Sequence, residues 1–386
     1  MPSSKRILVV GAGIAGPAVC YWLKRYGFRP TLIEKFHHIR KGGQALDIRG
    51  VACGLLKRMG IYERVCEMRT RIECGRYVDA HGHVLYEEQG EKFGFRQGEE
   101  VEIVRGDLIE ILMSTIEDVP CYFNQSINNI RQNDDVEVQF KDGKTEHYDL
   151  VIGADGIHSA IRRMVFDNNE YQLVNLGSYI SVFSMPNYLD LRHTEIVCEA
   201  KLKMASITSD EDPRKAQAAF MFRSSRVLNN IRDESEQKQF LRDAFHDFGW
   251  ETKKMLELMS CSEDFYFDSV TQIMMKSWTK GRVALLGDAG FCASPLSGQG
   301  NNLALVGAYI LAGELKTAKE DHTRAFRHYN ELLHPFVTTN QKFGQWVSES
   351  FLVPDEVSKN VAEARMNEIL QKMQAVTNAI TLPEYE

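Results

Sequence analysis

A short run of apolar residues opens the chain and is followed directly by glycines. Residues 7–10, Ile-Leu-Val-Val, contain no polar side chain and lead into Gly11. Such a run, ended by turn residues, is typical of a parallel strand that is covered on both faces. A helical pattern follows through Trp22, and residues 30–33 predict a second strand. Strand, helix and strand in this order predict an α/β fold with a parallel sheet.

Two later apolar runs, residues 150–152 and 283–286, have the same character and predict further buried strands. Helices are expected at residues 51–68 and 303–315, and at residues 107–116, where Asp107 would be the N-cap. Between residues 171 and 272 the pattern changes to β-type alternation, at residues 179–183, 196–204 and 218–222. This region therefore predicts a second sheet, with a helical segment between residues 234 and 259 and a hairpin at residues 75–86.

The third of these strands carries two phenylalanines, Phe220 and Phe222. Alternating aromatic residues pack in cores, and they also line substrate pockets, so both assignments stay open. A last helix is expected to begin at Pro354 and Asp355. Its apolar residues follow one stripe, so one face should dock on the body of the protein: Met366, Ile369, Leu370, Met373, Val376 and Ile380.

Composition excludes several classes of function. The 386 residues carry a net charge of −7, which argues against a nucleic-acid partner. No segment approaches the ~18 consecutive apolar residues of a membrane span. The eight cysteines form no CxxC pair, so free thiols in the cytoplasm are expected. His81 and His83 have no third ligand nearby in sequence, which favours turn residues over a metal site.

The first glycine cluster is a dinucleotide-binding fingerprint in its proper context. Gly11, Gly13 and Gly16 form GxGxxG between a predicted strand and a predicted helix. Gly11 makes the tight turn, Gly13 admits a pyrophosphate, and Gly16 lets the helix pack against the strand. Glu34 follows 18 residues later, where a ribose hydroxyl is bound. The fingerprint does not separate NAD from FAD.

Two further stretches follow predicted strands. The first, Gly153-Ala154-Asp155-Gly156, is followed by Ser159 and Arg162, a composition that neither a sheet nor a helix needs for stability alone. The second continues residues 283–286 with Gly287-Asp288 and then Pro295-Leu296-Ser297-Gly298-Gln299-Gly300-Asn301. A helix beginning near Asn301 would direct its free N–H groups at the same ligand.

Two features beside these stretches have open interpretations. Arg105 is either a solvated charge or a cofactor contact. The polar residues 35–50, with Gly42 and Gly43, form either a surface loop or a contact with a long cofactor.

Together, the three stretches resemble those of the single-component FAD monooxygenases of the para-hydroxybenzoate hydroxylase-like family. The resemblance implies a Rossmann-like FAD-binding domain with an inserted β-sheet substrate domain and a C-terminal helix. The corresponding ranges are 1–70, 101–170 and 273–345 for the first domain, 71–100 and 171–272 for the second, and 346–386 for the helical segment. The fingerprint and the resemblance together imply these cofactor contacts: Gly11, Gly13, Ala15, Gly16, Glu34, Lys35, Asp47, Arg105, Asp155, Asp288, Pro295, Gly298, Gln299, Gly300 and Asn301.

One residue departs from the family pattern, because Phe291 stands where a histidine is common. Altered flavin contacts are therefore expected at Phe291. Within the family, the Gly42–Asp47 loop and the terminal helix look most like the tetracycline-inactivating monooxygenases. That narrower resemblance implies that Asp47 contacts FAD and that the last helix helps to enclose the substrate.

The implied reaction consumes NADPH, or NADH in its place, and inserts one oxygen atom of O₂ into an electron-rich substrate through a flavin C4a-hydroperoxide. The substrate would be a tetracycline; the alternatives are a phenol or other small aromatic, or a ligand that a non-catalytic flavoprotein binds. No catalytic side chain is assigned, because the cofactor performs the chemistry. A monomer is expected. The four tryptophans do not form the WxWxI pattern of flavin halogenases.

Overall fold

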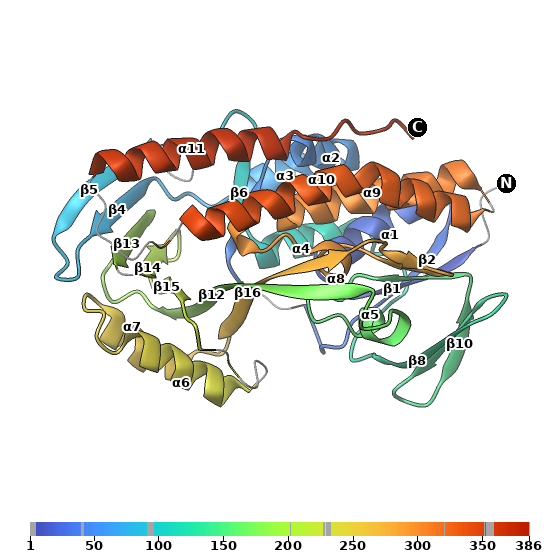
Figure 1. Ribbon diagram of the computed structural model, residues 1–386, viewed down its shortest axis with the longest axis horizontal. Helices are drawn as coiled ribbons and strands as arrows, with labels where there is room; N and C mark the ends of the chain where they lie inside the picture. Colours follow the sequence, from blue (N-terminus) through green and yellow to red (C-terminus); the bar gives the residue numbers. More distant parts are fainter. Residues whose placement is uncertain are drawn as a thin grey trace.

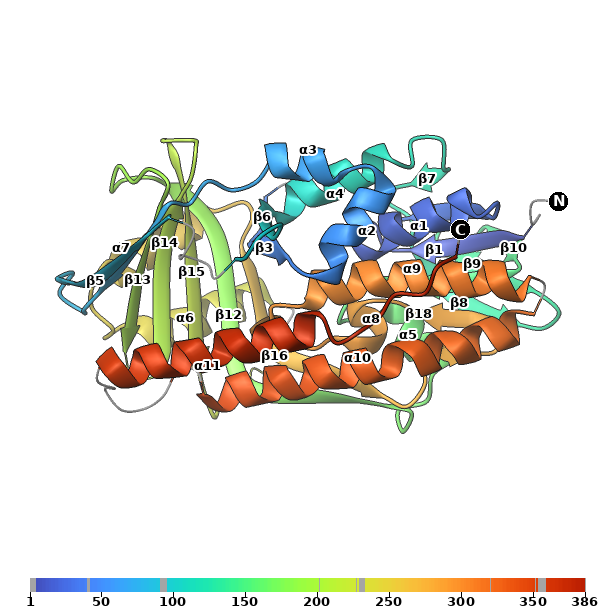
Figure 2. The same cartoon turned by 90° about the horizontal axis from the view of Figure 1, so that it is seen from above.

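The computed structural model describes residues 5–39, 42–90, 96–200, 202–226, 228, 233–319, 321–350, 352 and 359–385. It is an elongated molecule with a large sheet toward each end (Figures 1 and 2). The long strands β12 and β16 run from one end toward the other, and the C-terminal helices lie along the same direction.

The six-stranded sheet has the order β17-β18-β11-β1-β2-β7. Its strands are β17 (Thr279–Lys280), β18 (Val283–Leu285), β11 (Leu150–Gly153), β1 (Arg6–Val10), β2 (Arg29–Ile33) and β7 (Cys121–Tyr122). All neighbours pair in parallel except β17 and β18. The three predicted apolar strands are thus confirmed, and their side chains form the core with the helices around them.

Helices and two small sheets surround the six-stranded sheet. The helices include α1 (Ala15–Arg25), α2 (Val51–Met59), α4 (Arg105–Ser114), α5 (Ala160–Val165) and α9 (Gly300–Ala318). One small sheet contains β8 (Ile127–Gln132), β9 (Val136–Phe140) and β10 (Thr145–Tyr148), and the other pairs β3 (Ala45–Ile48) with β6 (Val101–Val104). Residues 35–50, expected to be loop throughout, therefore include a strand.

The seven-stranded sheet has the order β16-β12-β15-β14-β13-β4-β5. Its strands are β16 (Tyr266–Met275), β12 (Tyr171–Pro186), β15 (Lys215–Arg223), β14 (Lys203–Ser209), β13 (Thr194–Ala200), β4 (Cys74–Val78) and β5 (Val84–Gln89). Helices α6 (Glu234–Phe245) and α7 (Thr252–Leu258) cover one face. On the other side run α10 (His322–Ser350) and α11 (Lys359–Thr377) (Figure 1). The α/β class and the C-terminal helix are confirmed, while the division into domains remains a prediction.

Several predicted boundaries are wrong, each for a local reason. The helix over residues 51–68 is interrupted at Gly60, whose φ of 73° ends α2 before α3 (Tyr62–Glu67). The strand over residues 196–204 is two strands, because Leu202 has a φ of 68° in the turn between them. Helix α4 begins at Arg105 with Val104 at the N-cap, so Asp107 lies inside its first turn.

The last helix ends at Thr377, so Ile380 lies beyond it. The predicted start at residues 354–355 falls outside the described residues. Among the residues that the structure describes, no helix has the length and apolar character needed to cross a membrane. The same part of the chain holds no cluster of three His, Cys, Asp or Glu side chains suited to a metal ion.

Candidate active site

Four strands of the six-stranded sheet direct their carboxyl ends into one crevice. Strand β1 leads to Gly11, β2 to Glu34, β11 to Asp155 and β18 to Asp288. Strand β1 lies between β2 and β11, so the chain order reverses beside it. In parallel sheets a crevice at such a switch point is where ligands bind.

Two glycines of the fingerprint, Gly11 and Gly16, lie close to neighbouring backbone, whereas Gly13 has open space beside it. Gly11 has a φ of 110°, and a Cβ there would lie 2.5 Å from the Ala154 carbonyl oxygen. A Cβ on Gly16 would overlap the Gly11 carbonyl oxygen. At Gly13 the nearest atom is Arg105 Nη2, 3.8 Å away. Room for a ligand therefore exists at Gly13, where the fingerprint predicts it.

Glu34 and its neighbours fix the turn after β2. Its carboxylate accepts the Ala12 N–H at 2.8 Å and the Phe36 N–H at 3.0 Å, which ties the fingerprint to the end of β2. Lys35 lies exposed over the Phe36 ring. Ala15 opens α1 and packs toward Gly287, where an added Cβ would lie 3.2 Å from the Ala15 methyl group.

Arg105 lies between the fingerprint and the Gly42–Gly43 loop. Its Cβ is 3.6 Å from the position of an added Cβ on Gly43, and its N–H donates to the Gln44 carbonyl oxygen. The loop is held from the other side by Gln217 of β15, whose Nε2 donates to the Gly43 carbonyl at 2.9 Å. The expected contact of Arg105 with the cofactor stays a prediction, and the loop joins the two sheets.

Asp155 has a structural task that its sequence motif did not reveal. Its carboxylate accepts hydrogen bonds from Ser159 Oγ at 2.5 Å and from the Ala160 and Ile161 N–H groups, and so closes the start of α5. Arg162 is buried and donates to the carbonyls of Ala289 and Ile157. The expectation that stability alone does not require this composition is therefore wrong.

Asp288 is the carboxylate at the centre of the crevice. Its side chain is exposed toward the crevice although both chain neighbours are buried, and an added Cβ on Gly300 would lie 3.9 Å from its Oδ1. Helix α9 begins at Gly300, so its N-terminus faces the same space. Although part of Asp288 is exposed, the protein atoms packed around its carboxylate desolvate the charged form and raise its pKa, while the nearby Cys292 thiol and Arg105 act in the opposite direction.

The loop before α9 alternates between exposed and buried positions. Pro295 and Gly298 are exposed, whereas Gln299 is buried and its amide oxygen accepts from Asn302 at 2.8 Å. Asn301 donates to the Asp47 carbonyl at 2.7 Å. The loop is therefore fastened to β3 through Asn301, while Pro295 and Gly298 remain open to a ligand.

Asp47 belongs to a network of charges along β3 and β6. Its carboxylate binds Arg49 at 2.9 Å and Arg96 at 3.1 Å. Arg49, only 4% exposed, also binds Glu100 at 2.8 Å, and Arg96 also binds Glu102 at 3.1 Å. The side chain of Asp47 is thus committed to two arginines, and its expected contact with FAD stays a prediction.

Phe291, the residue that departs from the family pattern, points away from the crevice. It is 1% exposed and packs on Trp278 with ring centres 4.8 Å apart. A Cβ on Gly307 of α9 would lie 3.0 Å from its ring, so it fills the core beneath that helix. In this geometry Phe291 is a packing residue, and the expected change in flavin contacts is not supported.

Phe220 and Phe222 also lie in a core. Both are at most 1% exposed and pack against Phe245 of α6. The intervening side chains of β15 point to the opposite face of the sheet. On that face Gln217 reaches the Gly43 loop and Arg223 donates to the Ser348 carbonyl of α10 at 3.1 Å. The two phenylalanines are therefore core residues of the α6 side, and the expected substrate contact is not supported.

Helix α11 covers the Gly298 loop from outside. The Met373 Cε atom would be 3.9 Å from a Cβ on Gly298, and Met373 packs in a small apolar cluster. The cluster joins α10, α11 and the loop: Leu296, Phe343, Trp346, Val347, Ile369, Met373 and Val376. The docking stripe predicted for the last helix is confirmed at Ile369, Met373 and Val376.

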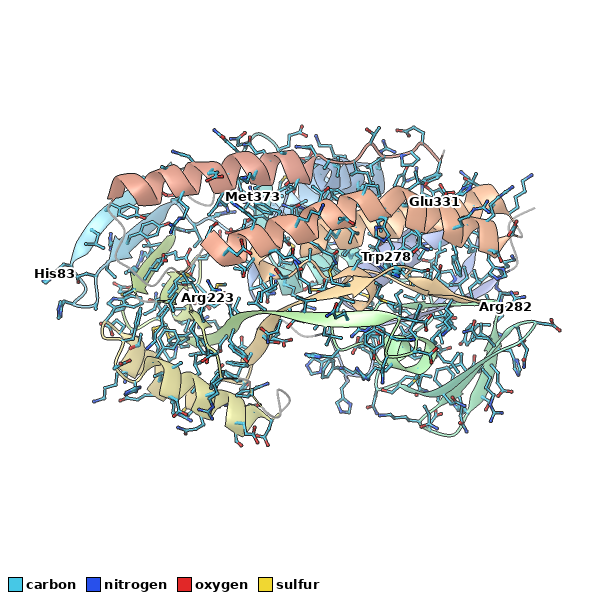
Figure 3. All side chains as sticks on the ribbon, viewed as in Figure 1. His83, Arg223, Trp278, Arg282, Glu331 and Met373 are labelled. Carbon is cyan, nitrogen blue, oxygen red and sulfur yellow. The ribbon has the colours of Figure 1, made fainter. Side chains whose placement is uncertain are left out.

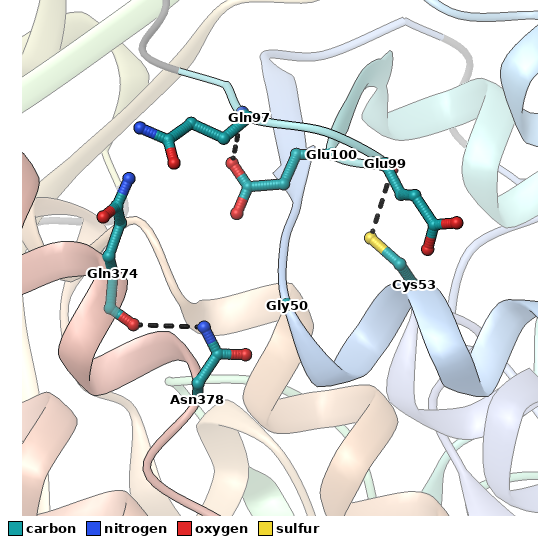
Figure 4. A pocket seen from close by; sticks show the side chains of 7 residues that line it. All are labelled: Gly50, Cys53, Gln97, Glu99, Glu100, Gln374 and Asn378. Atoms are coloured by element: carbon teal, nitrogen blue, oxygen red, sulfur yellow. Dashed lines mark hydrogen bonds between the residues drawn. The ribbon is translucent and has the colours of Figure 1, made fainter.

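The end of α11 docks on a glycine. A Cβ on Gly50 would lie 2.5 Å from Thr377 Cγ2, so only glycine admits the helix there. Beside this contact is a polar cavity of about 320 Å³ (Figure 4), lined by Gly50, Cys53, Gln97, Glu99, Glu100, Gln374 and Asn378.

Sequence reasoning missed residues whose role depends on contacts between distant segments. Tyr266 of β16 is one: burial raises the pKa of its phenol, and Asp268 and Asp288 act on it electrostatically. Gln217 and Met373 are two others. Alternation along β15 would have placed Gln217 opposite Phe220, but nothing in the sequence names the Gly43 carbonyl as its partner.

Comparison with known proteins gives the same cofactor. Residues 5–341 match the family described as the FAD binding domain. The chain is 67% identical over the full length of both proteins to a flavin-dependent monooxygenase of Legionella longbeachae serogroup 1 (strain NSW150). This chain is a member of the flavin-dependent monooxygenases.

Solved structures agree with this assignment. The monooxygenase is 62% identical to the tetracycline destructase Tet(51), with a TM-score of 0.93 over 99% of this chain and 100% of the other. It is 60% identical to the tetracycline destructase Tet(55), with a TM-score of 0.94 over the whole of both chains. The crevice fits FAD, because open space at Gly13 and the exposed carboxylate of Asp288 occur where a nucleotide and a polyol chain need them.

Proposed function

We propose that this monooxygenase inactivates tetracyclines by inserting one oxygen atom of O₂ into their enolic ring system, with NADPH as reductant. The observation that carries the proposal is the 60–62% identity, over 99–100% of the chain, to two structures described as tetracycline destructases. The arrangement of α11 supports it, because this helix runs along the side of the seven-stranded sheet opposite to α6 and packs with Leu296 of the loop before α9.

FAD, when bound, would accept electrons from NADPH and activate O₂. The task of the protein is to hold the cofactor, to stabilise negative charge on its ring and to keep water out. The N-terminus of α9 directs free N–H groups into the crevice at Gly300, beside Asp288. Donors that are already oriented toward developing charge contribute strongly to catalysis.

The free face of the seven-stranded sheet offers both apolar and polar groups to a polycyclic substrate. Val182, Val197, Met221 and Val270 are buried apolar residues of this sheet that lie outside the core on the α6 side. Glu195 lies on the same strand face as Val197, and burial raises the pKa of its carboxyl. A mixed surface of this kind suits a fused ring system with several oxygen substituents.

The deciding assay measures NADPH oxidation, O₂ consumption and absorbance change with a panel of tetracyclines and phenols. The proposal predicts that tetracyclines, and not phenols, stimulate all three signals. Stimulation by phenols alone would favour a hydroxylase of small aromatics. Binding of drug without O₂ consumption would indicate a flavoprotein without turnover.

The covering role of α11 is tested by ending the chain after residue 354. Removal of Ile369, Met373 and Val376 from the cluster exposes the loop before α9 to water, so the truncated enzyme should release more hydrogen peroxide per NADPH consumed. Unchanged coupling and unchanged drug affinity, in a truncated protein that still binds FAD, would contradict this role.

A further inference from the structure

An open groove lies at the edge of the six-stranded sheet that is opposite to the cofactor crevice. Strand β18 begins directly after Arg282, which lines the groove, and ends shortly before Asp288 in the crevice. The groove has a volume of about 700 Å³ and is formed by the β8–β9 turn, the segments around β17 and the first turns of α10. Its lining residues include Gln132, Lys276, Arg282, His322, Arg327 and Glu331.

The groove has more positive than negative charge, in a protein whose net charge is −7. Lys276, Arg282 and Arg327 face a single carboxylate, Glu331, which is 4.0 Å from Arg327. Figure 3 labels Arg282 and Glu331, both remote from His83 at the far end of the seven-stranded sheet. Unbalanced cations concentrated in a hollow attract anions.

Two of these cations have no carboxylate partner among the residues that the structure describes. Arg282 donates through Nε and Nη1 to the carbonyls of Asn133 and Asp149, at 3.2 and 3.5 Å. These bonds hold the guanidinium in place and engage neither N–H of Nη2. Lys276 is exposed at the same groove, with no hydrogen bond or ion pair in the described part of the chain.

The pKa of His322 indicates the sign of the electrostatic potential in the groove. It is the first residue of α10, and its ring packs edge-on against Phe326, with ring centres 5.8 Å apart. Burial lowers the pKa of His322, and the positive charges of Arg282 and Lys5 lower it further, while Asp321 acts in the opposite direction. The groove is thus electropositive at the imidazole, and an anion bound there would raise the pKa of His322.

We propose that this groove binds a phosphorylated small molecule, with the phosphoryl group between Arg282 and Lys276. Lys276 precedes β17, Arg282 follows it, and Arg327 lies on α10. A ligand that binds all three cations must therefore present acceptor oxygens in several directions. A phosphoryl group has three such oxygens, whereas a carboxylate has two in one plane. The volume lies in the range of small-molecule sites and leaves space beyond one phosphate.

The test uses the full-length, FAD-loaded enzyme and two probes, pyrophosphate and ADP, in isothermal titration calorimetry at fixed ionic strength. Saturable binding of pyrophosphate is expected, weakened about 10-fold or more by Arg282→Gln, since a charge-assisted contact is lost. Lys276→Gln should weaken it too. The Lys276 side chain makes no hydrogen bond or ion pair with the residues that the structure describes, so this variant keeps the test valid if Arg282→Gln does not fold. Tighter binding of ADP than of pyrophosphate would show that the site also holds the organic part.

The matched control is Arg214→Gln, which removes the same charge at an exposed position paired with Asp212. It should leave pyrophosphate binding unchanged. A second readout is the NMR titration of His322, assigned with His322→Gln, whose pKa should rise when pyrophosphate is present. The proposal is overturned if the wild type shows no saturable binding, if both groove variants bind as the wild type does, or if Arg214→Gln weakens binding equally.

Discussion

The C-terminal residues after α11 are held by several contacts, including an ion pair of Glu384 with Arg58 and a hydrogen bond from Tyr309 to the Pro383 carbonyl. Among residues 378–385, Tyr385 is the buried one. Tyr385 is 7% exposed and lies against Gly313 of α9, where an added Cβ would overlap its ring. Its hydroxyl donates to Glu314 at 2.7 Å, and its carbonyl accepts from Lys316. We expect Tyr385→Ala to release residues 378–385 and to loosen the end of α11.

The size of the effect follows from these contacts. Truncation of a buried aromatic side chain to alanine costs about 3–5 kcal/mol in a core. Tyr385→Phe removes only the hydrogen bond to a charged group, which contributes about 1.5–3 kcal/mol, and Glu314 keeps its contact with His328 at 3.1 Å. A loss of 3 kcal/mol raises the open population of the segment about a hundredfold, because each 1.4 kcal/mol is a factor of ten.

Gly313 supplies a matched test of the same packing. Alanine in the middle of a helix is about 1 kcal/mol more favourable than glycine, so Gly313→Ala should stabilise the protein if Tyr385 were absent. With Tyr385 in place the new methyl group overlaps its ring, and Gly313→Ala should destabilise instead. The two substitutions together should therefore be less harmful than their sum.

The assay is digestion by a carboxypeptidase, followed by mass spectrometry, with hydrogen exchange in α11 measured in parallel. Digestion of residues 378–385 should be slow in the wild type. It should be about a hundredfold faster in Tyr385→Ala if the segment opens and closes faster than it is cleaved, because the cleavage rate then follows the open population. Equal digestion rates for the two proteins, or destabilisation by Gly313→Ala that persists in the Tyr385→Ala background, would show that packing of Tyr385 on Gly313 does not hold the segment.

Three further predictions concern the site. Asp288→Ala should purify with less FAD than the wild type, because the exposed carboxylate at the start of α9 is lost; flavin absorbance per protein measures this. Arg49→Leu should lower the free energy of unfolding by about 3–5 kcal/mol in a urea titration, since Glu100 and Asp47 lose a buried partner. Glu195→Gln should stabilise the protein at neutral pH, because burial raises the pKa of Glu195 and penalises its charged form; the gain should shrink as pH falls toward the ordinary pKa of a glutamate.

Each of these has a result that would contradict it. Full flavin occupancy in Asp288→Ala would remove the proposed role of that carboxylate. If Arg49→Leu lowered the free energy of unfolding by less than about 1 kcal/mol, the ion pairs of Arg49 would contribute no more than exposed ion pairs do. For Glu195, the sign follows from linkage: a raised carboxyl pKa contributes stability that is present at low pH and is lost as pH rises through the folded-state value. A stability gain of Glu195→Gln that is constant from pH 4 to pH 8 would therefore exclude titration of this group as its cause.

Elements with a local residue pattern could be predicted from the amino-acid sequence. The apolar runs at β1, β11 and β18 are confirmed as parallel strands, and Gly11 and Gly16 make the close backbone contacts that the fingerprint predicts, whereas the contact of Gly13 with a ligand stays a prediction. These features follow from backbone sterics and from strand burial on both faces, which are written in adjacent residues. The resemblance drawn from the three stretches named the FAD monooxygenases correctly.

Contacts between segments that are far apart in the chain could not be predicted from the sequence, and the folded structure reveals them. It placed Phe291 in the core beneath α9, Phe220 on the side of α6, and the carboxylate of Asp155 at the start of α5. It also brought Gln217 to the Gly43 carbonyl and Tyr385 to Gly313. The physical reason is the same in each case: a side chain's type limits which interactions it can make, whereas the packing of distant segments selects the partner with which it makes them.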